Sequence, residues 1–175
     1  MKHLKTFGLS LLLLSGSVFA QDNHLMVGLI SSHFHNFKAD QRISEMRNPF
    51  SSGVLLGYSV NQNLAFSMTG QYMNGDMEDK TGDESMTRLT LSAHVFPFQW
   101  NLVKPYVSGG LVYTRQSLDS DLVGDEVHHF LQLRQSLGLD VMLFPHVSLN
   151  FDMSVYSDGL NYLGEVNSFG LRYIL

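Results

Sequence analysis

The sequence predicts an all-β protein, an eight-stranded antiparallel up-and-down transmembrane β-barrel, and three observations support this fold class. Polar and apolar residues alternate along nearly all of the chain after residue 20, with the period of two that is typical of a β-strand. One face of each alternating segment is aliphatic or aromatic, and the other is rich in serine, threonine, glutamine, glycine and charge. Short and long connections also alternate between the segments, as they do in outer-membrane barrels.

Residues 1–20 have the pattern of a cleaved secretory signal peptide. Lys2 and Lys5 precede an apolar run at 11–14, and the segment ends at Ala20. The apolar run is too short to span a bilayer as a helix. We therefore expect cleavage after Ala20 and an outer-membrane barrel domain at residues 21–175.

The composition of the mature chain excludes several classes of protein. It contains no cysteine, so no disulfide stabilises it. Without Lys2 and Lys5 it has 9 basic (11 minus 2) and 16 acidic residues, a formal net charge of −7, which argues against nucleic acid as a partner. No later segment has the roughly 18 continuous apolar residues of a membrane helix, which argues against a helical inner-membrane protein.

Eight segments alternate in this way, and we expect strands at residues 25–35, 52–60, 64–73, 87–96, 105–115, 130–143, 148–157 and 165–175. The apolar faces of the first four are, in order, Leu25, Val27 and Leu29; Val54, Leu56, Tyr58 and Val60; Leu64, Phe66, Met68 and Tyr72; and Leu89, Leu91, Ala93 and Val95. Those of the last four are Val107, Leu111 and Tyr113; Leu131, Leu133, Leu137, Leu139, Val141 and Leu143; Leu149, Phe151, Met153 and Val155; and Phe169, Leu171, Tyr173 and Leu175.

The lengths of the connections predict the topology. The shorter links are 61–63, 97–104 and 144–147, and the longer, mostly polar ones are 36–51, 74–86, 116–129 and 158–164. An even number of strands places both termini in the periplasm, so the longer links are expected outside the cell. The barrel must close, because an open sheet edge is not tolerated in hydrocarbon. In the sixth strand the leucines then face lipid, and Arg134 and Asp140 face the interior.

Three stretches carry a resemblance to a known family: Gly53–Tyr58 (GVLLGY), Lys104–Tyr113 (KPYVSGGLVY) and Ser168–Tyr173 (SFGLRY). Over essentially the whole mature chain, the sequence resembles the small eight-stranded OmpA/OmpX-like outer-membrane barrels. The resemblance implies a location in the cell outer membrane and recognition by the barrel assembly machinery through the last strand. Members commonly end in an aromatic residue, whereas this chain ends in Leu175.

Long side chains are expected inside the barrel. Eight strands enclose an interior that side chains can fill. The long residues on the polar faces are Gln71, Arg88, His94, Gln132, Arg134, Asp152, Tyr156 and Arg172. We therefore expect a plugged lumen and not an open solute channel. The alternative is a narrow or gated conductance.

The interior charges suggest an ionic cluster of Asp140, Asp152 and Arg172. Both aspartates flank the turn near residues 145–146 and would repel each other without a cation. Arg134 lies six residues from Asp140 along the same strand, roughly 20 Å away at about 3.4 Å per residue, and is too distant to neutralise it. Arg172 is expected opposite residue 150, within reach of Asp152. The alternative is that water, serine and asparagine satisfy each charge separately.

An enzymatic reading rests on Ser157. The stretch at 156–160, followed by Glu165, resembles lipid A deacylase barrels, which carry a His-x-Ser pair on the penultimate strand and a glutamate on the last. A serine is a weak nucleophile without an adjacent base, and the position of that base is occupied by Val155. The one His-x-Ser pair, His146 and Ser148, falls in a predicted periplasmic turn. We therefore assign no catalytic residue.

Possible metal sites were considered at the outer ends of the strands. His33, His35, His128 and His129 fall there, but on strands that are distant around the ring. The acidic segments 75–84 and 118–127 carry oxygen ligands of the kind that calcium prefers, without the spacing of an EF-hand. We interpret the histidines as rim residues and the acidic segments as solvated loops, and we assign no metal. Arg115, at the outer end of the fifth strand on the lipid-facing side, is a candidate contact for a lipopolysaccharide phosphate.

The sequence thus favours a non-enzymatic surface or envelope protein of the outer membrane that acts through its extracellular loops. One alternative is a lipid A-modifying acyl hydrolase. Another is a soluble periplasmic barrel that carries a small apolar ligand, which would need its apolar side chains turned inward. We expect a monomer without cofactor, whose partners are outer-membrane lipid, lipopolysaccharide and the barrel assembly machinery.

Overall fold

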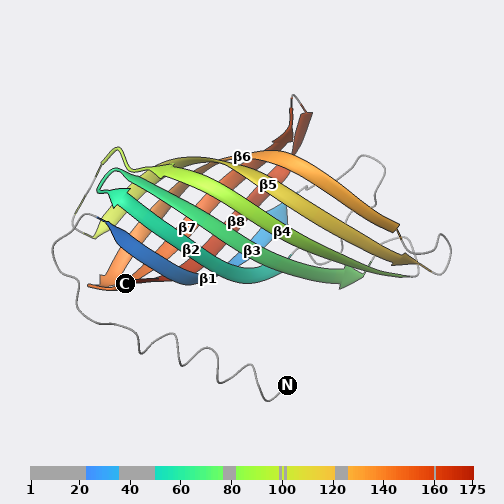
Figure 1. Cartoon of the computed structure of the whole chain (residues 1–175), viewed down its shortest axis with the longest axis horizontal. Coiled ribbons are helices and arrows are strands. Elements are labelled where there is room, and N and C mark those ends of the chain that lie inside the picture. Colours follow the sequence, from blue (N-terminus) through green and yellow to red (C-terminus); the bar gives the residue numbers. More distant parts are fainter. Residues whose placement is uncertain are drawn as a thin grey trace, which may run out of the picture.

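The computed structural model is a closed barrel of eight antiparallel strands that run obliquely around it in chain order (Figure 1). The structure describes residues 23–35, 50–76, 82–98, 100, 102–120, 126–159 and 161–175. The strands are β1 (His24–His35), β2 (Phe50–Asn61), β3 (Leu64–Asp76), β4 (Gly82–Val95), β5 (Val103–Ser120), β6 (Glu126–Phe144), β7 (Val147–Asp158) and β8 (Asn161–Ile174). Because β1 pairs with both β2 and β8, the barrel closes and the predicted fold class is confirmed.

The predicted signal peptide at residues 1–20 lies outside the described residues. Within the described part of the chain, no helix is long and apolar enough to cross a membrane.

The start of β1, the end of β8 and the two short turns lie at one end of the barrel. Met26 is the register partner of Ile174, and His24 is the partner of Ser59, close to the β2–β3 turn. Val147, just after the β6–β7 turn, is the partner of Tyr173. We call this the inner end, which the predicted topology places in the periplasm, and the opposite end the outer end.

Apolar side chains cover the outside of the barrel and charged ones fill the inside. The outward-facing Leu137 and Met153 are 66% and 68% exposed, whereas the inward-facing Arg88 and Arg172 are 1% and 4% exposed. A protein surrounded by water shows the reverse distribution. The alternative of a soluble carrier, which needed its apolar side chains inside, is therefore wrong.

Several strands extend further toward the outer end than the sequence predicted. β4 begins at residue 82 and not 87, β5 ends at 120 and not 115, and β6 begins at 126 and not 130. The apolar alternation stops at the outer edge of the belt of lipid-facing apolar side chains. The backbone pairing between strands continues beyond this edge, toward the outer end, where Glu84 pairs with Leu118. The links predicted at 74–86 and 116–129 are therefore shorter than expected.

The β7–β8 link is also shorter than predicted. β8 begins at Asn161 and not at 165, and Asp158 pairs with Asn161 across the turn. Gly159 in this turn has a φ of +61°, a conformation that favours glycine. The ladder shifts register just below the turn, between Tyr156 and Ser157.

Candidate functional site

The inside of the barrel consists of three layers of side chains. Near the inner end, Met26, Ala65, Phe96 and Tyr106 form an inner apolar cluster against which Ile174 packs. Polar and charged residues occupy the middle. Near the outer end is an outer apolar cluster, made of Phe34, Met73, Met86, Val112, Tyr156, Leu163 and Val166. All eight long side chains that were predicted to point inward are buried.

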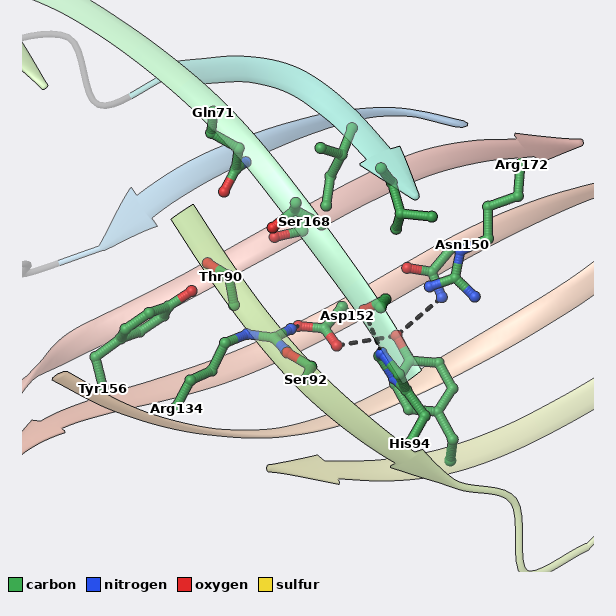
Figure 2. A pocket seen from close by; sticks show the side chains of 15 residues that line it. Gln71, Thr90, Ser92, His94, Arg134, Asn150, Asp152, Tyr156, Ser168 and Arg172 are labelled. Carbon is green, nitrogen blue, oxygen red and sulfur yellow. Dashed lines mark hydrogen bonds and ion pairs between the residues drawn. The ribbon is translucent and has the colours of Figure 1, made fainter. Parts of the chain in front are cut away.

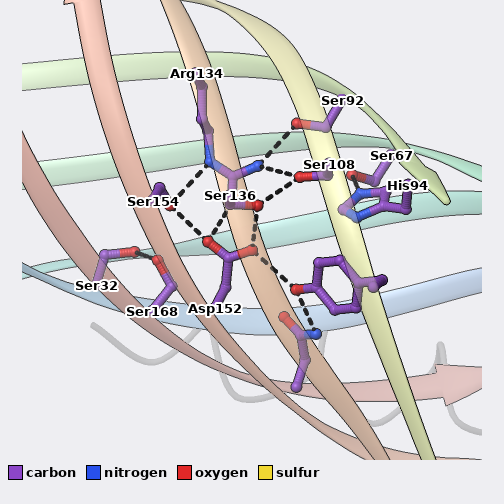
Figure 3. A network of polar contacts seen from close by, with 12 residues as sticks. Ser32, Ser67, Ser92, His94, Ser108, Arg134, Ser136, Asp152, Ser154 and Ser168 are labelled. Atoms are coloured by element: carbon purple, nitrogen blue, oxygen red, sulfur yellow. Dashed lines mark hydrogen bonds and ion pairs between the residues drawn. The ribbon is translucent and has the colours of Figure 1, made fainter. Parts of the chain in front are cut away.

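Asp152 on β7 is the centre of the middle layer (Figure 3). Its carboxylate accepts a hydrogen bond from Tyr106 Oη at 2.9 Å, one from Ser136 Oγ at 2.8 Å and one from Ser154 Oγ at 2.5 Å. Arg134 Nη2 forms an ion pair with the same carboxylate. The carboxylate is thus neutralised and hydrogen bonded by side chains of β5, β6 and β7.

Arg134 is held by hydroxyl groups as well as by Asp152. Its Nε donates to Ser154 Oγ at 3.1 Å, and its Nη1 donates to Ser92 Oγ at 3.1 Å and to Ser108 Oγ at 3.3 Å. Small serines on the inner face leave room for the long guanidinium side chain to extend across the lumen. The ion pair therefore has a fixed geometry and not merely a favourable charge.

The absence of a side chain at Gly138 allows the Tyr106 ring to lie in this layer. A Cβ at Gly138 would lie 2.2 Å from the Tyr106 ring and 2.6 Å from the carbonyl oxygen of Phe151. The ring therefore packs against bare backbone of β6, where its hydroxyl reaches Asp152 and also accepts a hydrogen bond from Asn150 Nδ2 at 2.8 Å. Tyr106 was not among the residues predicted to point inward, although it has the same parity along β5 as Ser108.

The predicted cluster of Asp140, Asp152 and Arg172 is corrected by this geometry. Arg172 Nη1 contacts Asp140 Oδ2 at 3.3 Å, as expected, but Asp152 pairs with Arg134 instead. Asp140 lies opposite Asn150, whereas Asp152 lies opposite Gly138, so the two carboxylates are at different heights. The prediction considered only the distance from Arg134 to Asp140 along β6. It did not consider that the Arg134 side chain reaches Asp152 on the neighbouring strand β7.

The outer apolar cluster surrounds a third arginine. The Arg88 guanidinium carbon lies 4.8 Å from the ring centre of Phe34 and 4.4 Å from that of Tyr156, in cation–π geometry. The sequence did not predict this cluster, although parity contained the signal. Met73 shares a face with Gln71, and Val112 lies between the inward positions 110 and 114.

Glu84 shows where the predicted loop is in fact a strand. It was assigned to an acidic solvated segment, but it lies in β4, its side chain is 1% exposed, and it accepts a hydrogen bond from Gln116 Nε2. Above the lipid belt, therefore, the inner face of the barrel continues to hold polar pairs.

Little free space remains in the middle layer. A cavity of about 20 Å³ lies among residues that include His94, Arg134, Asn150 and Asp152 (Figure 2). Figure 2 shows Tyr156 and Arg172 on opposite sides of Asp152 in this space. Such a volume holds about one water molecule.

The residues considered for hydrolysis do not form a nucleophile–base pair. Val155 points outward from β7 and is 44% exposed, and its register partner on β8 is Glu165. Ser157 is half-buried at the outer end of β7, opposite Tyr162. The position that would hold an activating histidine is thus an apolar side chain on the outer wall.

The rim histidines contact side chains on an adjacent strand or on their own strand. The His33 and Phe50 rings lie 4.5 Å apart. His129 stacks on Tyr113 at 5.8 Å and shares a 2.7 Å hydrogen bond with its hydroxyl, while His128 lies 3.1 Å from Glu126. Among the residues that the structure describes, no group of three or more His, Cys, Asp or Glu gathers to hold a metal. The side chain of His35 and residues 77–81 and 121–125 of the acidic segments lie outside the described part of the chain.

Arg115 lies on the lipid-facing wall, toward the outer end of β5. It is exposed, and its register partners are Thr87 on β4 and His129 on β6. Two positions below it, Tyr113 is 45% exposed on the same face. An arginine, a histidine and a tyrosine thus lie together where the apolar belt ends.

Comparison with known proteins identifies the family. The model of the outer membrane protein beta-barrel domain matches residues 7–173, almost the whole chain. The chain belongs to this family. It is therefore a small bacterial outer-membrane β-barrel protein, and its predicted location in the outer membrane is confirmed. No curated protein shows significant sequence similarity to it.

Solved structures share the fold at low sequence identity. The N-terminal barrel of Pseudomonas aeruginosa OprF matches with a TM-score of 0.63 and 13% identity, covering 89% of this chain and 98% of that one. Neisserial surface protein A matches with a TM-score of 0.57 and 18% identity, covering 89% and 99%. Yersinia pestis Ail, in complex with the heparin analogue sucrose octasulfate, matches with a TM-score of 0.54 and 16% identity, covering 87% and 97%. At these identities the likeness concerns the fold alone.

Proposed function

We propose that this barrel is a non-enzymatic surface protein that acts through its extracellular loops and outer rim, while its lumen stays closed. The filled middle layer is the observation that carries the proposal. Arg134, Asp152 and the serines around them occupy the cross-section, and the adjoining cavity holds only about one water molecule. A solute channel would need this network to move aside.

The outer rim contributes a contact with lipopolysaccharide in this proposal. Arginine binds phosphate with two parallel hydrogen bonds, and Arg115 is exposed where the apolar belt ends. His129 and Tyr113 beside it supply an imidazole and an aromatic ring. The acidic loop segments do not favour a polyanion such as the ligand in the Ail structure, so we place the anion contact at Arg115 only.

The rim contact is tested by thermal unfolding of the barrel in nanodiscs that contain lipid A with or without its phosphates. Wild type is expected to melt higher with the phosphorylated lipid, because a ligand that binds only the folded state stabilises it. Arg115→Gln should lose most of this difference and Arg115→Lys only part, since lysine lacks the planar fork of arginine. An undiminished difference in Arg115→Gln would refute the contact.

The competing function is hydrolysis of lipid A. We expect mass spectra of lipid A from cells with and without the protein to be the same, because no base lies beside Ser157. Loss of an acyl chain that depends on Ser157, tested with Ser157→Ala, would replace the proposal with an enzyme.

A further inference from the structure

The outer wall carries a groove of about 650 Å³ across β5, β6, β7 and β8. Its apolar lining is Val107, Leu137, Met153 and Val155, its polar outward-facing lining is Gln135, Glu165 and Asn167, and its remaining residues are the inward-facing Ser108, Ser136 and Ser154. We call this the β5–β8 groove. It lies on the lipid-facing side of the barrel, and neither the closed lumen nor the Arg115 rim includes it.

A glycine borders the groove, beside the lining residues Val107 and Gln135. Gly109 is the register partner of Gln135 and faces outward between the larger Val107 and Leu111. A Cβ at Gly109 would meet no heavy atom within 4 Å, so open space surrounds this position. Large neighbours around a position without a side chain leave a concave strip in an otherwise convex wall.

Three polar side chains of the groove face outward in an otherwise apolar wall. On the lipid-facing side of β6, Gln135 lies between Leu133 and Leu137, which are 44% and 66% exposed. Glu165 and Asn167 are exposed on the same wall of β8, and Tyr162 is hydrogen bonded to Glu165. Polar groups without a partner are costly in hydrocarbon. Gln135, Asn167 and the remaining acceptor positions of Glu165 therefore favour an occupant that offers hydrogen bonds.

The groove is amphipathic along the barrel axis. Its lower row follows one register line, from Val107 through Leu137 and Met153 to Asn167. The row nearer the outer end runs from Gly109 through Gln135 and Val155 to Glu165. Three of the four apolar lining residues thus lie in the row toward the membrane centre, and two of the three polar outward-facing ones lie in the row nearer the outer surface, which matches the orientation of a lipid in the outer leaflet.

We propose that the β5–β8 groove binds a glycolipid of the outer leaflet whose acyl chains carry amide and hydroxyl donors near the sugar, as those of lipid A do. Gln135 and Asn167 both donate and accept hydrogen bonds, whereas an ionised Glu165 only accepts. The ester linkages of a phospholipid offer only acceptors at this depth, so Glu165 favours the glycolipid. A second barrel is a poorer occupant, because its convex wall does not reach the floor of a concave strip.

This inference does not rest on the Arg115 contact. Arg115 pairs with His129, which is six residues from Gln135 along β6, roughly 20 Å at about 3.4 Å per residue. The groove recognises the amide and hydroxyl region of the lipid, whereas Arg115 recognises its phosphate. A loss of lipid A binding that persists with lipid A lacking phosphates is therefore attributed to the groove. A loss of binding seen only with the phosphorylated lipid is attributed to Arg115 at the rim.

The test counts lipids bound to the mature barrel after release from nanodiscs of phosphatidylcholine and lipid A, by native mass spectrometry. Wild type is expected to retain lipid A in preference to phosphatidylcholine. Gly109→Leu places a large side chain at the border of the groove beside Gln135 without removing a polar group, and Gln135→Leu restores the apolar stripe. Gln135→Leu is expected to lower lipid A retention about fivefold, the equivalent of one lost hydrogen bond. Gly109→Leu should lower it at least as much, because its side chain obstructs the lipid sterically.

The matched control is Gly70→Leu on β3. Gly70 lies between the outward-facing Met68 and Tyr72, and a Cβ there also meets nothing within 4 Å, but it lies outside the groove. Its lipid A retention should equal that of wild type. Folding of each variant is checked by its electrophoretic mobility with and without boiling.

A photoreactive residue in place of Met153 gives an independent readout if a leucine variant does not fold. It should crosslink to lipid A, whereas the same residue in place of Tyr72 should not. Three outcomes would overturn the proposal: Gly109→Leu retains as much lipid A as wild type, wild type retains phosphatidylcholine equally well, or barrels pair in nanodiscs and Gly109→Leu separates them. The last outcome would assign the groove to a second copy of the chain.

Discussion

At the scale of single residues, the fold depends on neutralising charge where bulk water does not reach. Asp152 accepts hydrogen bonds from three hydroxyls and pairs with one guanidinium, and these partners belong to β5, β6 and β7. Asp140 has Arg172, 3.3 Å away. Because the desolvation of each charge is offset only by its partner, the cost of losing a partner exceeds the value of the pair itself.

A double-mutant cycle tests this pairing. Asp152→Asn is expected to lower the free energy of unfolding by about 3–5 kcal/mol, because it leaves the Arg134 charge buried and unpaired. Arg134→Gln combined with it should show strong coupling, whereas Arg172→Gln should be additive with it to within about 0.5 kcal/mol. Urea titration in phospholipid vesicles measures all three. Strong coupling to Arg172 instead would restore the originally predicted cluster.

The lipid-facing assignment of β6 is tested by moving an arginine along its outer face. Leu137→Arg is expected to cost roughly 2–4 kcal/mol of unfolding free energy, because Leu137 lies well inside the apolar belt. Val127→Arg is the matched control, since Val127 faces the same way at the outer end of β6. Its cost should be about 0–1 kcal/mol. Equal and small costs at both sites would indicate a water-exposed sheet.

Parity along the strands was enough to predict which side chains point inward, but not which of them meet. Arg134 and Asp152 come together because Asp152 lies four residues along β7 from Tyr156, the register partner of Arg134, and because serines leave room for the long arginine side chain to cover that distance. Both conditions depend on the exact register between strands and on side chains beyond the directly paired residues. The periodicity of a single segment gives no information about either of these.

At the scale of the elements, the strands extend beyond the alternating sequence pattern that predicts them. The sequence located all eight strands because the lipid belt imposes alternation on each. Above the belt both faces are polar or mixed, so the outer parts of β4, β5 and β6 carry no contrast between faces. The outer apolar cluster lies in the same zone, where Met73 and Met86 face inward at positions that alternation alone assigns to the polar face.

The orientation of the strands is tested with epitope tags. A tag inserted near Thr81, in the link between β3 and β4, should be reached by antibody on intact cells. A tag near Gln62, in the β2–β3 turn, should be reached only after the outer membrane is permeabilised. The reverse pattern would invert the topology and place Arg115 in the periplasm.

At the scale of the whole molecule, the barrel is an apolar wall around a solid polar and apolar interior. The two apolar clusters lie on either side of the Arg134–Asp152 pair, so this pair is shielded from both ends. A molecule of this kind has its outer surface, rim and loops available for interaction, and the proposals for Arg115 and the β5–β8 groove both follow from that arrangement.

The most direct test of the membrane-barrel account is lipid accessibility along β6. Because the chain has no cysteine, single cysteines can be introduced at each position from 131 to 143 and labelled with a probe that a lipid-bound quencher detects. We predict strong quenching at the odd positions, which include Leu131, Leu137 and Leu139, and weak quenching at the even positions, which include Arg134 and Asp140. Quenching with no period of two, or with the even positions in contact with lipid, would contradict the account.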